Sequence, residues 1–125
     1  MKNILDKIVE NKKLEIKKSK ALISIQKLQT SPLFNRQCFS FAEAIKAKSG
    51  IIAEFKRKSP SKGVINRKVI VEEVVSGYEK AGVSAISVLT DTKFFGGTFN
   101  DLIRARSVVN VPILRKDFII DNYQL

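Results

Sequence analysis

Residues 51–63 read Ile-Ile-Ala-Glu-Phe-Lys-Arg-Lys-Ser-Pro-Ser-Lys-Gly, and the interpretation of the whole chain starts from this stretch. A short apolar run that ends in ionisable groups and then breaks at Ser-Pro predicts a strand over residues 51–56, followed by a loop. Because side chains two apart on a strand share a face, Ile52, Glu54 and Lys56 point to the same side. A Glu and a Lys on such a face are costly unless something uses them. Charge at the carboxyl end of a strand is typical of active sites in parallel α/β folds.

Downstream of this stretch, helix-like and strand-like segments alternate. Apolar residues recur at helical spacing over residues 68–81 and 99–109, which predicts two helices. Residues 85–89 and 111–116 are short and mostly apolar, as expected of parallel strands covered on both faces. Residues 121–125 predict the start of a further helix. This order of elements predicts right-handed βαβ units and a parallel sheet.

The part of the chain before the first strand has a helical pattern. Residues 4–20 predict a basic amphipathic helix. Such a helix suits a membrane surface or nucleic acid, but packing of its apolar stripe on the protein is the favoured interpretation. Residues 21–29 are ambiguous. A second, short helix is predicted over residues 40–45, with Ser40 as its N-cap and Glu43 at the capping-box position.

Composition limits the possible functions. The 125 residues carry a net charge of +11, divided as +7 over residues 1–49 and +4 over residues 50–125, which would attract nucleic acid, anionic membranes or phosphorylated metabolites. Nucleic acid is disfavoured as a partner because neither an aromatic RNA-binding pattern nor a helix-turn-helix is recognisable. No apolar run approaches the ~20 residues of a membrane span. The single thiol, Cys38, suits the reducing cytoplasm, and the absence of His excludes His-based metal sites and catalytic triads.

Polar groups follow the ends of all three predicted strands. On the third strand, Leu114, Lys116 and Phe118 share a face. If this face meets that of Glu54 and Lys56, two lysines and a glutamate converge in one pocket. One lysine could then give a proton to a carbonyl or hydroxyl oxygen, and the other could hold a phosphate or carboxylate. Lys116 is the hardest of these residues to explain as structure, because it ends an apolar strand.

Structural explanations remain open for several of the other candidates. The basic run at residues 56–58 is equally well explained as a solvated turn. Gly96 and Gly97 favour a tight turn over a phosphate-binding loop. Phe94 and Phe95 suit the core, but two Phe beside two Gly in a loop also suggest an aromatic wall for a flat ligand.

Three long segments carry a resemblance to a known family. Residues 51–61 (IIAEFKRKSPS), residues 86–97 (with ISVLTD and KFFGG) and residues 112–121 (PILRKDFIID) closely resemble motifs of indole-3-glycerol-phosphate synthases. Residues 4–9 and 39–41 are similar to the helices that precede the barrel in that family. The resemblance covers essentially the whole chain, with its motifs in the correct order.

The resemblance implies a fold, a reaction and a set of site residues. The family is a (β/α)₈ barrel of roughly 250 residues. Residues 1–49 correspond to its N-terminal helical extension and residues 50–125 to its first three βα units. The enzyme closes the ring of 1-(2-carboxyphenylamino)-1-deoxyribulose 5-phosphate, releasing carbon dioxide and water, in tryptophan biosynthesis without cofactor or metal. Lys116 is implied as the general acid, with catalytic assistance from Glu54 and from Lys56, which lies near the phosphate or acts in the dehydration. Further substrate contacts are implied for Ser59, Pro60, Phe95 and Phe118.

The same resemblance implies that these residues hold only part of the pocket. Three of the eight strands are present, and both the general-base glutamate of the fourth strand and the main phosphate loops of the family are missing. The chain alone is therefore expected to be inactive. The alternative is a catalytically inactive half-barrel that acts as an assembly module, pairing the open edge of its third strand with the remaining barrel or with a second copy.

Overall fold

The computed structural model describes all 125 residues. The chain divides into two compact units. The larger unit comprises residues 38–117, and the smaller one comprises residues 1–37 together with residues 118–125. The division of the sequence between residues 49 and 50 rests on the pattern of helices and strands and stays a prediction.

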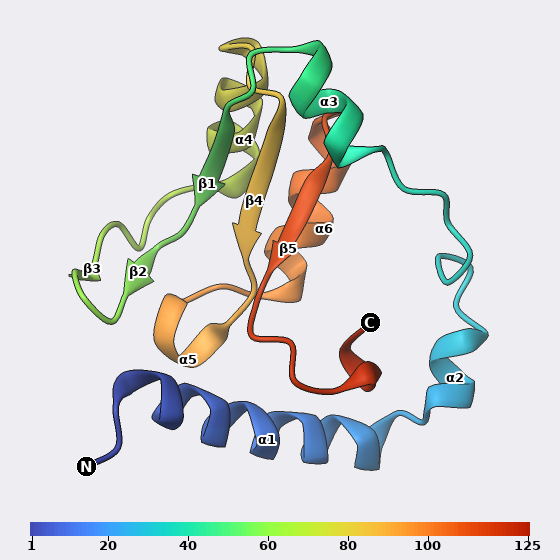
Figure 1. The fold of residues 1–125 in the computed structure, drawn as a ribbon, viewed down its shortest axis with the longest axis vertical. Coiled ribbons are helices and arrows are strands. Elements are labelled where there is room, and N and C mark those ends of the chain that lie inside the picture. Colours follow the sequence, from blue (N-terminus) through green and yellow to red (C-terminus); the bar gives the residue numbers. More distant parts are fainter. The chain divides into compact units, whose positions relative to one another are not determined.

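The larger unit is built on a three-stranded parallel sheet. Its strands are β1 (Ile52–Phe55), β4 (Ala85–Leu89) and β5 (Ile113–Lys116), in the order β1-β4-β5. Helix α4 (Val71–Lys80) connects the first two strands, and helix α6 (Phe99–Val108) lies between the second and the third (Figure 1). The predicted βαβ pattern and the parallel sheet are therefore confirmed, with strand limits that differ from the predicted ones by at most two residues.

The hydrophobic core lies on the face of the sheet that α4 and α6 cover. β4 is buried along its whole length because it is the central strand. Alternation along β1 turns Phe55 into this core and Glu54 to the opposite face. The core is formed by buried apolar side chains of both layers, among them Phe55, Val71, Val75, Ile86, Val88 and Ala105.

Two helices of the larger unit differ in detail from their predicted form. Helix α4 begins at Val71 rather than at residue 68, and the N–H of Lys68 donates to Asn66 Oδ1 at 2.9 Å in the preceding loop. The short helix α3 (Phe41–Ala47) runs two residues beyond the predicted end at residue 45. Its N-cap is as predicted, since Ser40 Oγ accepts a hydrogen bond from the N–H of Glu43 at 3.2 Å.

Loops at the carboxyl ends of the strands contain further elements that the sequence did not predict. A small hairpin of β2 (Lys58–Ser59) and β3 (Gly63–Val64) follows β1, and the four-residue helix α5 (Thr92–Phe95) follows β4 (Figure 1). Gly63, the first residue of β3, has a φ of 63°, a conformation that favours glycine. These elements were too short to produce a periodic pattern.

The smaller unit contains helix α1 (Ile4–Leu22), helix α2 (Ile25–Gln29) and a 3₁₀ turn at Asn122–Gln124. The predicted helix over residues 121–125 is thus a single 3₁₀ turn. The hydroxyl of Tyr123 donates to the carbonyls of Ser19 at 3.1 Å and Ile23 at 2.7 Å, which satisfies acceptors at the end of α1. No helix of the structure combines the length and apolar character that a membrane span requires.

Candidate functional site

A cluster of charged side chains lies on the face of the sheet opposite the core. Lys56 Nζ is 3.3 Å from Glu54 Oε1, and Lys116 Nζ is 3.6 Å from Glu54 Oε2. Ser87 Oγ donates a hydrogen bond to Glu54 Oε2 at 3.1 Å. These four residues, called the Glu54 cluster below, come from β1 and the residue directly after it, from β4 and from the end of β5. The predicted convergence of two lysines and one glutamate is confirmed by these distances.

The sheet register explains why these side chains meet. Glu54 pairs with Ser87 across β1 and β4, and Ser87 pairs with Leu114 across β4 and β5. Because residues in register on neighbouring strands point to the same face, Glu54 and Ser87 lie side by side. Lys116 is two residues beyond Leu114, so its long side chain reaches back diagonally across β4 to the carboxylate.

Glu54 is held in its ionised form. Burial raises the pKa of its carboxyl group, but the hydrogen bonds from Lys56 and Ser87 and the charges of Lys116 and Lys56 outweigh this effect. The net result is a pKa below the usual value. One carboxylate between two ammonium groups leaves the cluster with a net positive charge. Since the side chains of Lys56 and Lys116 are 36% and 54% exposed, an anionic ligand could reach both.

The second residue of the basic run, Arg57, has a structural partner that the sequence did not reveal. Its guanidinium forms two hydrogen bonds with Asp101, at 2.5 and 2.8 Å, and lies 5.0 Å from the centre of the Phe55 ring. Burial raises the pKa of Asp101, but the hydrogen bond and charge of Arg57, together with hydrogen bonds from Thr98, outweigh this effect. The net result is a pKa below the usual value. The spacing of Thr98 and Asp101 was a signal for a helix N-cap, but nothing in the sequence indicated the arginine.

The basic run is therefore not simply a solvated turn. Lys56 belongs to the Glu54 cluster, and Arg57 forms a largely buried pair with Asp101. The third residue, Lys58, donates from Nζ to the carbonyl of Lys93 at 2.7 Å, linking the loop after β1 to α5. The three side chains thus have different partners, and only that of Lys56 belongs to the Glu54 cluster.

Ser59 and Pro60 lie in the hairpin after β1 rather than in the cluster. The side chain of Ser59 is buried within its own turn, where Oγ accepts from the N–H of Lys62 at 3.2 Å and lies 3.3 Å from Ser61 Oγ. Pro60 is exposed at the tip. The structure thus gives Ser59 a turn-stabilising role, and substrate contacts for both residues stay predictions.

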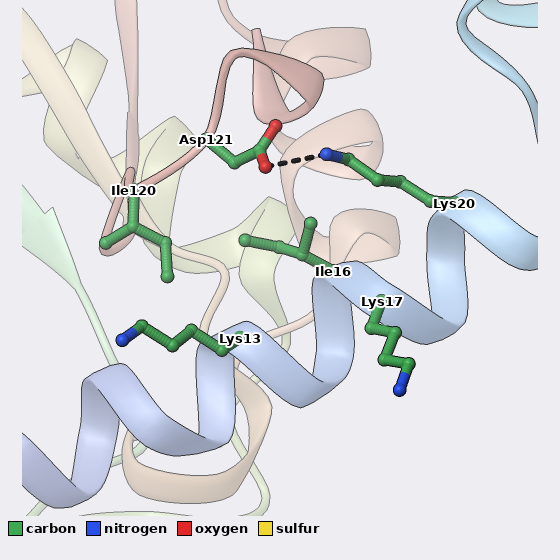
Figure 2. A pocket seen from close by; sticks show the side chains of 6 residues that line it. All are labelled: Lys13, Ile16, Lys17, Lys20, Ile120 and Asp121. Atoms are coloured by element: carbon green, nitrogen blue, oxygen red, sulfur yellow. Dashed lines mark hydrogen bonds and ion pairs between the residues drawn. The ribbon is translucent and has the colours of Figure 1, made fainter.

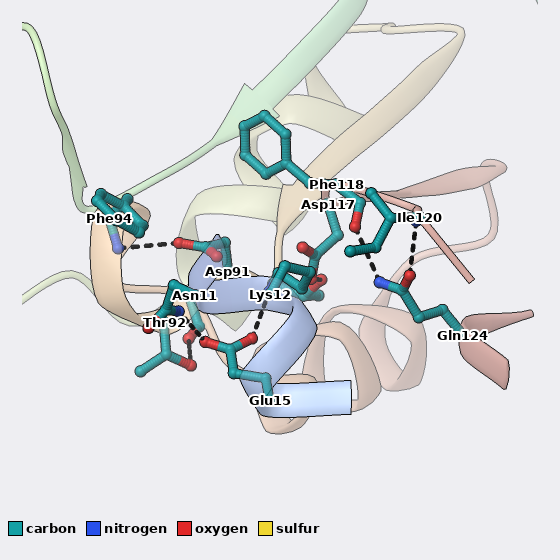
Figure 3. A network of polar contacts seen from close by, with 12 residues as sticks. Asn11, Lys12, Glu15, Asp91, Thr92, Phe94, Asp117, Phe118, Ile120 and Gln124 are labelled. Carbon is teal, nitrogen blue, oxygen red and sulfur yellow. Dashed lines mark hydrogen bonds and ion pairs between the residues drawn. The ribbon is translucent and has the colours of Figure 1, made fainter. Parts of the chain in front are cut away.

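The loop after β4 is built around two glycines. Asp91 caps α5 by accepting from the N–H of Phe94 at 2.9 Å, a contact drawn in Figure 3. Gly96 ends the helix at a φ of 67°, and Gly97 packs so closely on β4 that an added Cβ would lie 2.0 Å from the carbonyl oxygen of Leu89. The tight-turn interpretation of these glycines is confirmed. Phe95 is half-buried in this loop.

Phe118 is the first residue of the second segment of the smaller unit. Its carbonyl accepts a hydrogen bond from Gln124 Nε2 at 2.9 Å, as Figure 3 shows. The same figure shows a separate contact of the smaller unit, in which Asn11 and Lys12 both donate to Glu15 on α1. Its contact with a substrate ring stays a prediction.

The smaller unit also contains a groove of about 440 Å³ (Figure 2). Across it, Lys20 Nζ pairs with Asp121 Oδ2 at 2.7 Å. That hydrogen bond, with one from the N–H of Tyr123, lowers the pKa of Asp121. The groove is lined by Lys13, Ile16, Lys17, Lys20, Ile120 and Asp121, so no residue of the Glu54 cluster lines it. Nowhere in the structure do three His, Cys, Asp or Glu side chains gather in a way that could hold a metal ion.

Comparison with known proteins identifies the family. A sequence model described as indole-3-glycerol phosphate synthase matches residues 5–125. A protein of that name from Bacteroides thetaiotaomicron is 52% identical over 126 residues, which cover 100% of this chain and 48% of the relative. One from Bacillus cereus is 47% identical over 125 residues, covering 100% and 47%, and one from Endomicrobium trichonymphae is 44% identical over 126 residues, covering 98% and 48%.

The chain spans about half the length of these curated relatives. Its parallel βαβ units and preceding helices are those of the N-terminal part of a (β/α)₈ barrel, which confirms the predicted fold class. The Glu54 cluster lies towards the carboxyl ends of the strands, where barrels of this kind carry their sites. The chain belongs to the indole-3-glycerol phosphate synthase family.

Proposed function

We propose that the Glu54 cluster supplies the proton donor, Lys116, and its electrostatic partners, Glu54 and Lys56, in an indole-3-glycerol phosphate synthase. The substrate is 1-(2-carboxyphenylamino)-1-deoxyribulose 5-phosphate, a phosphorylated small molecule. The observation that supports the proposal is the placement of Lys56 and Lys116 on either oxygen of the Glu54 carboxylate, at 3.3 and 3.6 Å. This arrangement keeps two cations within reach of one anionic substrate.

In the proposed reaction, Lys116 is the general acid. It protonates the carbonyl oxygen of the sugar while the ring carbon that carries the carboxylate attacks the carbonyl carbon. The carboxylate then leaves as carbon dioxide. The hydroxyl formed from the carbonyl oxygen takes up a second proton and leaves as water, and the neighbouring methylene carbon loses a proton, so that the new double bond completes the indole ring. General acid catalysis of this kind contributes roughly 10²–10⁴-fold to a rate.

The remaining residues hold the substrate and the acid in place. Glu54 attracts the ammonium of Lys116 and fixes its position. Lys56 binds the phosphate or acts in the dehydration step. Phe95 and Phe118 flank the aromatic ring of the substrate. Ser59 and Pro60 lie beside the substrate, in the loop after β1.

The function can be tested in a chimaeric barrel, in which these 125 residues replace the matching part of the Bacteroides thetaiotaomicron relative. We expect the chimaeric barrel to form indole-3-glycerol phosphate, measured by the fluorescence of the new indole ring. The isolated 125-residue chain should show no measurable turnover, because electrostatic catalysis needs the whole preorganised pocket. A folded but inactive chimaera would refute the proposed function, and turnover by the isolated chain would refute its dependence on the other units.

A second candidate is an assembly module without catalysis of its own. It is supported by the position of β5 at the edge of the sheet, where Leu114 is 44% exposed. An edge strand offers unpaired backbone groups to a further strand. When the isolated chain is mixed with the remaining βα units of the relative, size-exclusion chromatography should show one complex. A complex without turnover would favour the module over the enzyme.

Glu54 should be needed for turnover and not only for folding. In the chimaeric barrel, Glu54→Gln keeps the shape of the side chain but removes the charge that holds Lys56 and Lys116. We expect kcat to fall by roughly 10–100-fold, as for a misplaced catalytic group. The control is Glu73→Gln on the exposed face of α4, which should leave the kinetics unchanged. Normal kinetics for Glu54→Gln would move Glu54 to a structural role.

A further inference from the structure

The ends of β4 and β5 are joined by side chains beyond their last paired residues. Leu89 and Lys116 form the final pair of the register, and the N–H of Thr90 donates to the carbonyl of Lys116 at 3.0 Å. One residue further along both strands, Thr90 Oγ1 donates to Asp117 Oδ2 at 2.7 Å. Thr90 is 5% exposed, and the side chain of Asp117 is 2% exposed. The backbone hydrogen bond to Lys116 and this buried side-chain hydrogen bond to Asp117 therefore both join the end of β4 to the end of β5.

Arg115 supports the same pair from β5. Its Nη2 lies 3.7 Å from Asp117 Oδ2, and its Nε donates to Thr90 Oγ1 at 3.4 Å. The guanidinium also lies 4.8 Å from the centre of the Phe99 ring on α6. Arg115 and Asp117 are two residues apart and share the helix-covered face, so Lys116 between them points to the opposite face. Thr90, Arg115 and Asp117 thus hold the backbone of Lys116 from the side away from the Glu54 cluster.

Besides this backbone, only the ion pair with Glu54 is seen to hold the side chain of Lys116. It is 54% exposed, and its Nζ contacts Glu54 Oε2 at 3.6 Å, longer than a normal hydrogen bond. Its position thus depends on where the end of β5 lies. Misplacement of a reacting group by about 1 Å can cost about 10²-fold in rate.

We propose that Thr90 and Asp117 are positioning residues for Lys116, which fix the end of β5 so that the lysine points at the Glu54 carboxylate. This inference rests on the proposed function, in which Lys116 is the general acid. Neither residue touches the substrate in this proposal, since both side chains are buried on the opposite face.

The kinetic test uses Thr90→Val in the chimaeric barrel, because valine has nearly the same shape as threonine but lacks the hydroxyl. We expect kcat to fall about 10–100-fold with KM within about threefold of the unsubstituted protein. Thr90→Ser, which keeps the hydroxyl, should retain kcat within about threefold. The matched control is Ser84→Ala, which removes a buried hydroxyl that accepts from the N–H of Gly50 at 2.8 Å, just before the start of β4. It should lower stability without lowering kcat.

A second measurement is independent of activity. In the isolated chain, the pKa of Glu54 can be followed by ¹³C NMR of its labelled carboxyl group. Thr90→Val should raise this pKa towards the usual value, because Lys116 moves away, whereas Ser84→Ala should leave it unchanged. If Thr90→Val does not fold, the smaller Thr90→Ala takes its place with the same expectations.

The outcomes are separable. Without activity in the unsubstituted chimaera the proposed function fails, and the titration of Glu54 alone decides whether Thr90 positions Lys116. With activity, the positioning role requires both the loss of kcat and the rise of the Glu54 pKa. An unchanged kcat or an unchanged pKa in the Thr90 variant overturns it.

Discussion

Replacing Lys116 by alanine in the chimaeric barrel should lower kcat by about 10³-fold and change KM little. Lys116 Nζ is the group placed to protonate the substrate, 3.6 Å from the Glu54 carboxylate that orients it. A group that acts mainly in the transition state contributes to kcat rather than to ground-state binding. Steady-state kinetics on the chimaera, with indole fluorescence as the signal, measures both constants.

A second variant separates the proton of Lys116 from its charge. Lys116→Arg keeps a cation beside Glu54, but the guanidinium holds its proton too tightly to act as an acid. We expect its kcat to stay within about tenfold of the alanine variant. Lys80→Ala, at an exposed position in the last turn of α4, controls for the loss of a positive charge. A kcat near that of the unsubstituted protein in either Lys116 variant would remove Lys116 from the mechanism.

Replacing Gly97 by alanine should be the most destabilising small substitution in the loops that flank the site. The added Cβ would lie 2.0 Å from the carbonyl oxygen of Leu89, 2.6 Å from its carbonyl carbon and 3.0 Å from Thr90 Cα. These are backbone atoms of the central strand, so the clash cannot be relieved by a side-chain rotation. We expect a loss of about 3 kcal/mol or more in the free energy of unfolding, at the upper end for overpacking.

The matched control is Gly77→Ala within helix α4, where an added Cβ meets no atom within 4 Å. This change should raise the free energy of unfolding by about 0.5–1 kcal/mol, since alanine is the better helix former. Urea unfolding of the isolated chain, followed by circular dichroism, measures both variants. A loss below about 1 kcal/mol for Gly97→Ala would mean that the loop moves away from β4 at little cost.

The regular part of the fold was predictable because its elements have strong periodic patterns. The three strands and both crossover helices are long enough for the spacing of their apolar residues to show the type of element, and Gly50 before β1 and Gly82 after α4 mark two of the boundaries. The β2–β3 hairpin and α5 were missed because two to four residues carry no periodicity. The predicted start of α4 was three residues too early, because Lys68 lies in the preceding loop, where its N–H donates to Asn66 Oδ1.

The charged cluster was predictable for a different reason. Alternation along β1 and β5 fixes the face of Glu54, Lys56 and Lys116, and a parallel sheet brings the ends of its strands together. The pairs Arg57–Asp101 and Thr90–Asp117 could not be predicted in this way, because they join residues 44 and 27 positions apart, and Arg57, Thr90 and Asp117 lie outside the helices and strands. Such contacts depend on how the loops close over the sheet, which the local pattern does not specify.

The two tyrosines lie one in each unit of the protein, at positions suited to spectroscopic labelling. The chain has no tryptophan, and Tyr78 and Tyr123 are its only tyrosines. Tyr123 closes the end of α1 in the smaller unit, whereas the hydroxyl of Tyr78 in the larger unit donates to the backbone carbonyl of Glu54 at 3.1 Å. Fluorinated tyrosine would therefore give one ¹⁹F resonance for each unit. The Tyr78 resonance would follow the strand that carries the charged cluster, and the pair would reveal whether the two units melt at the same temperature.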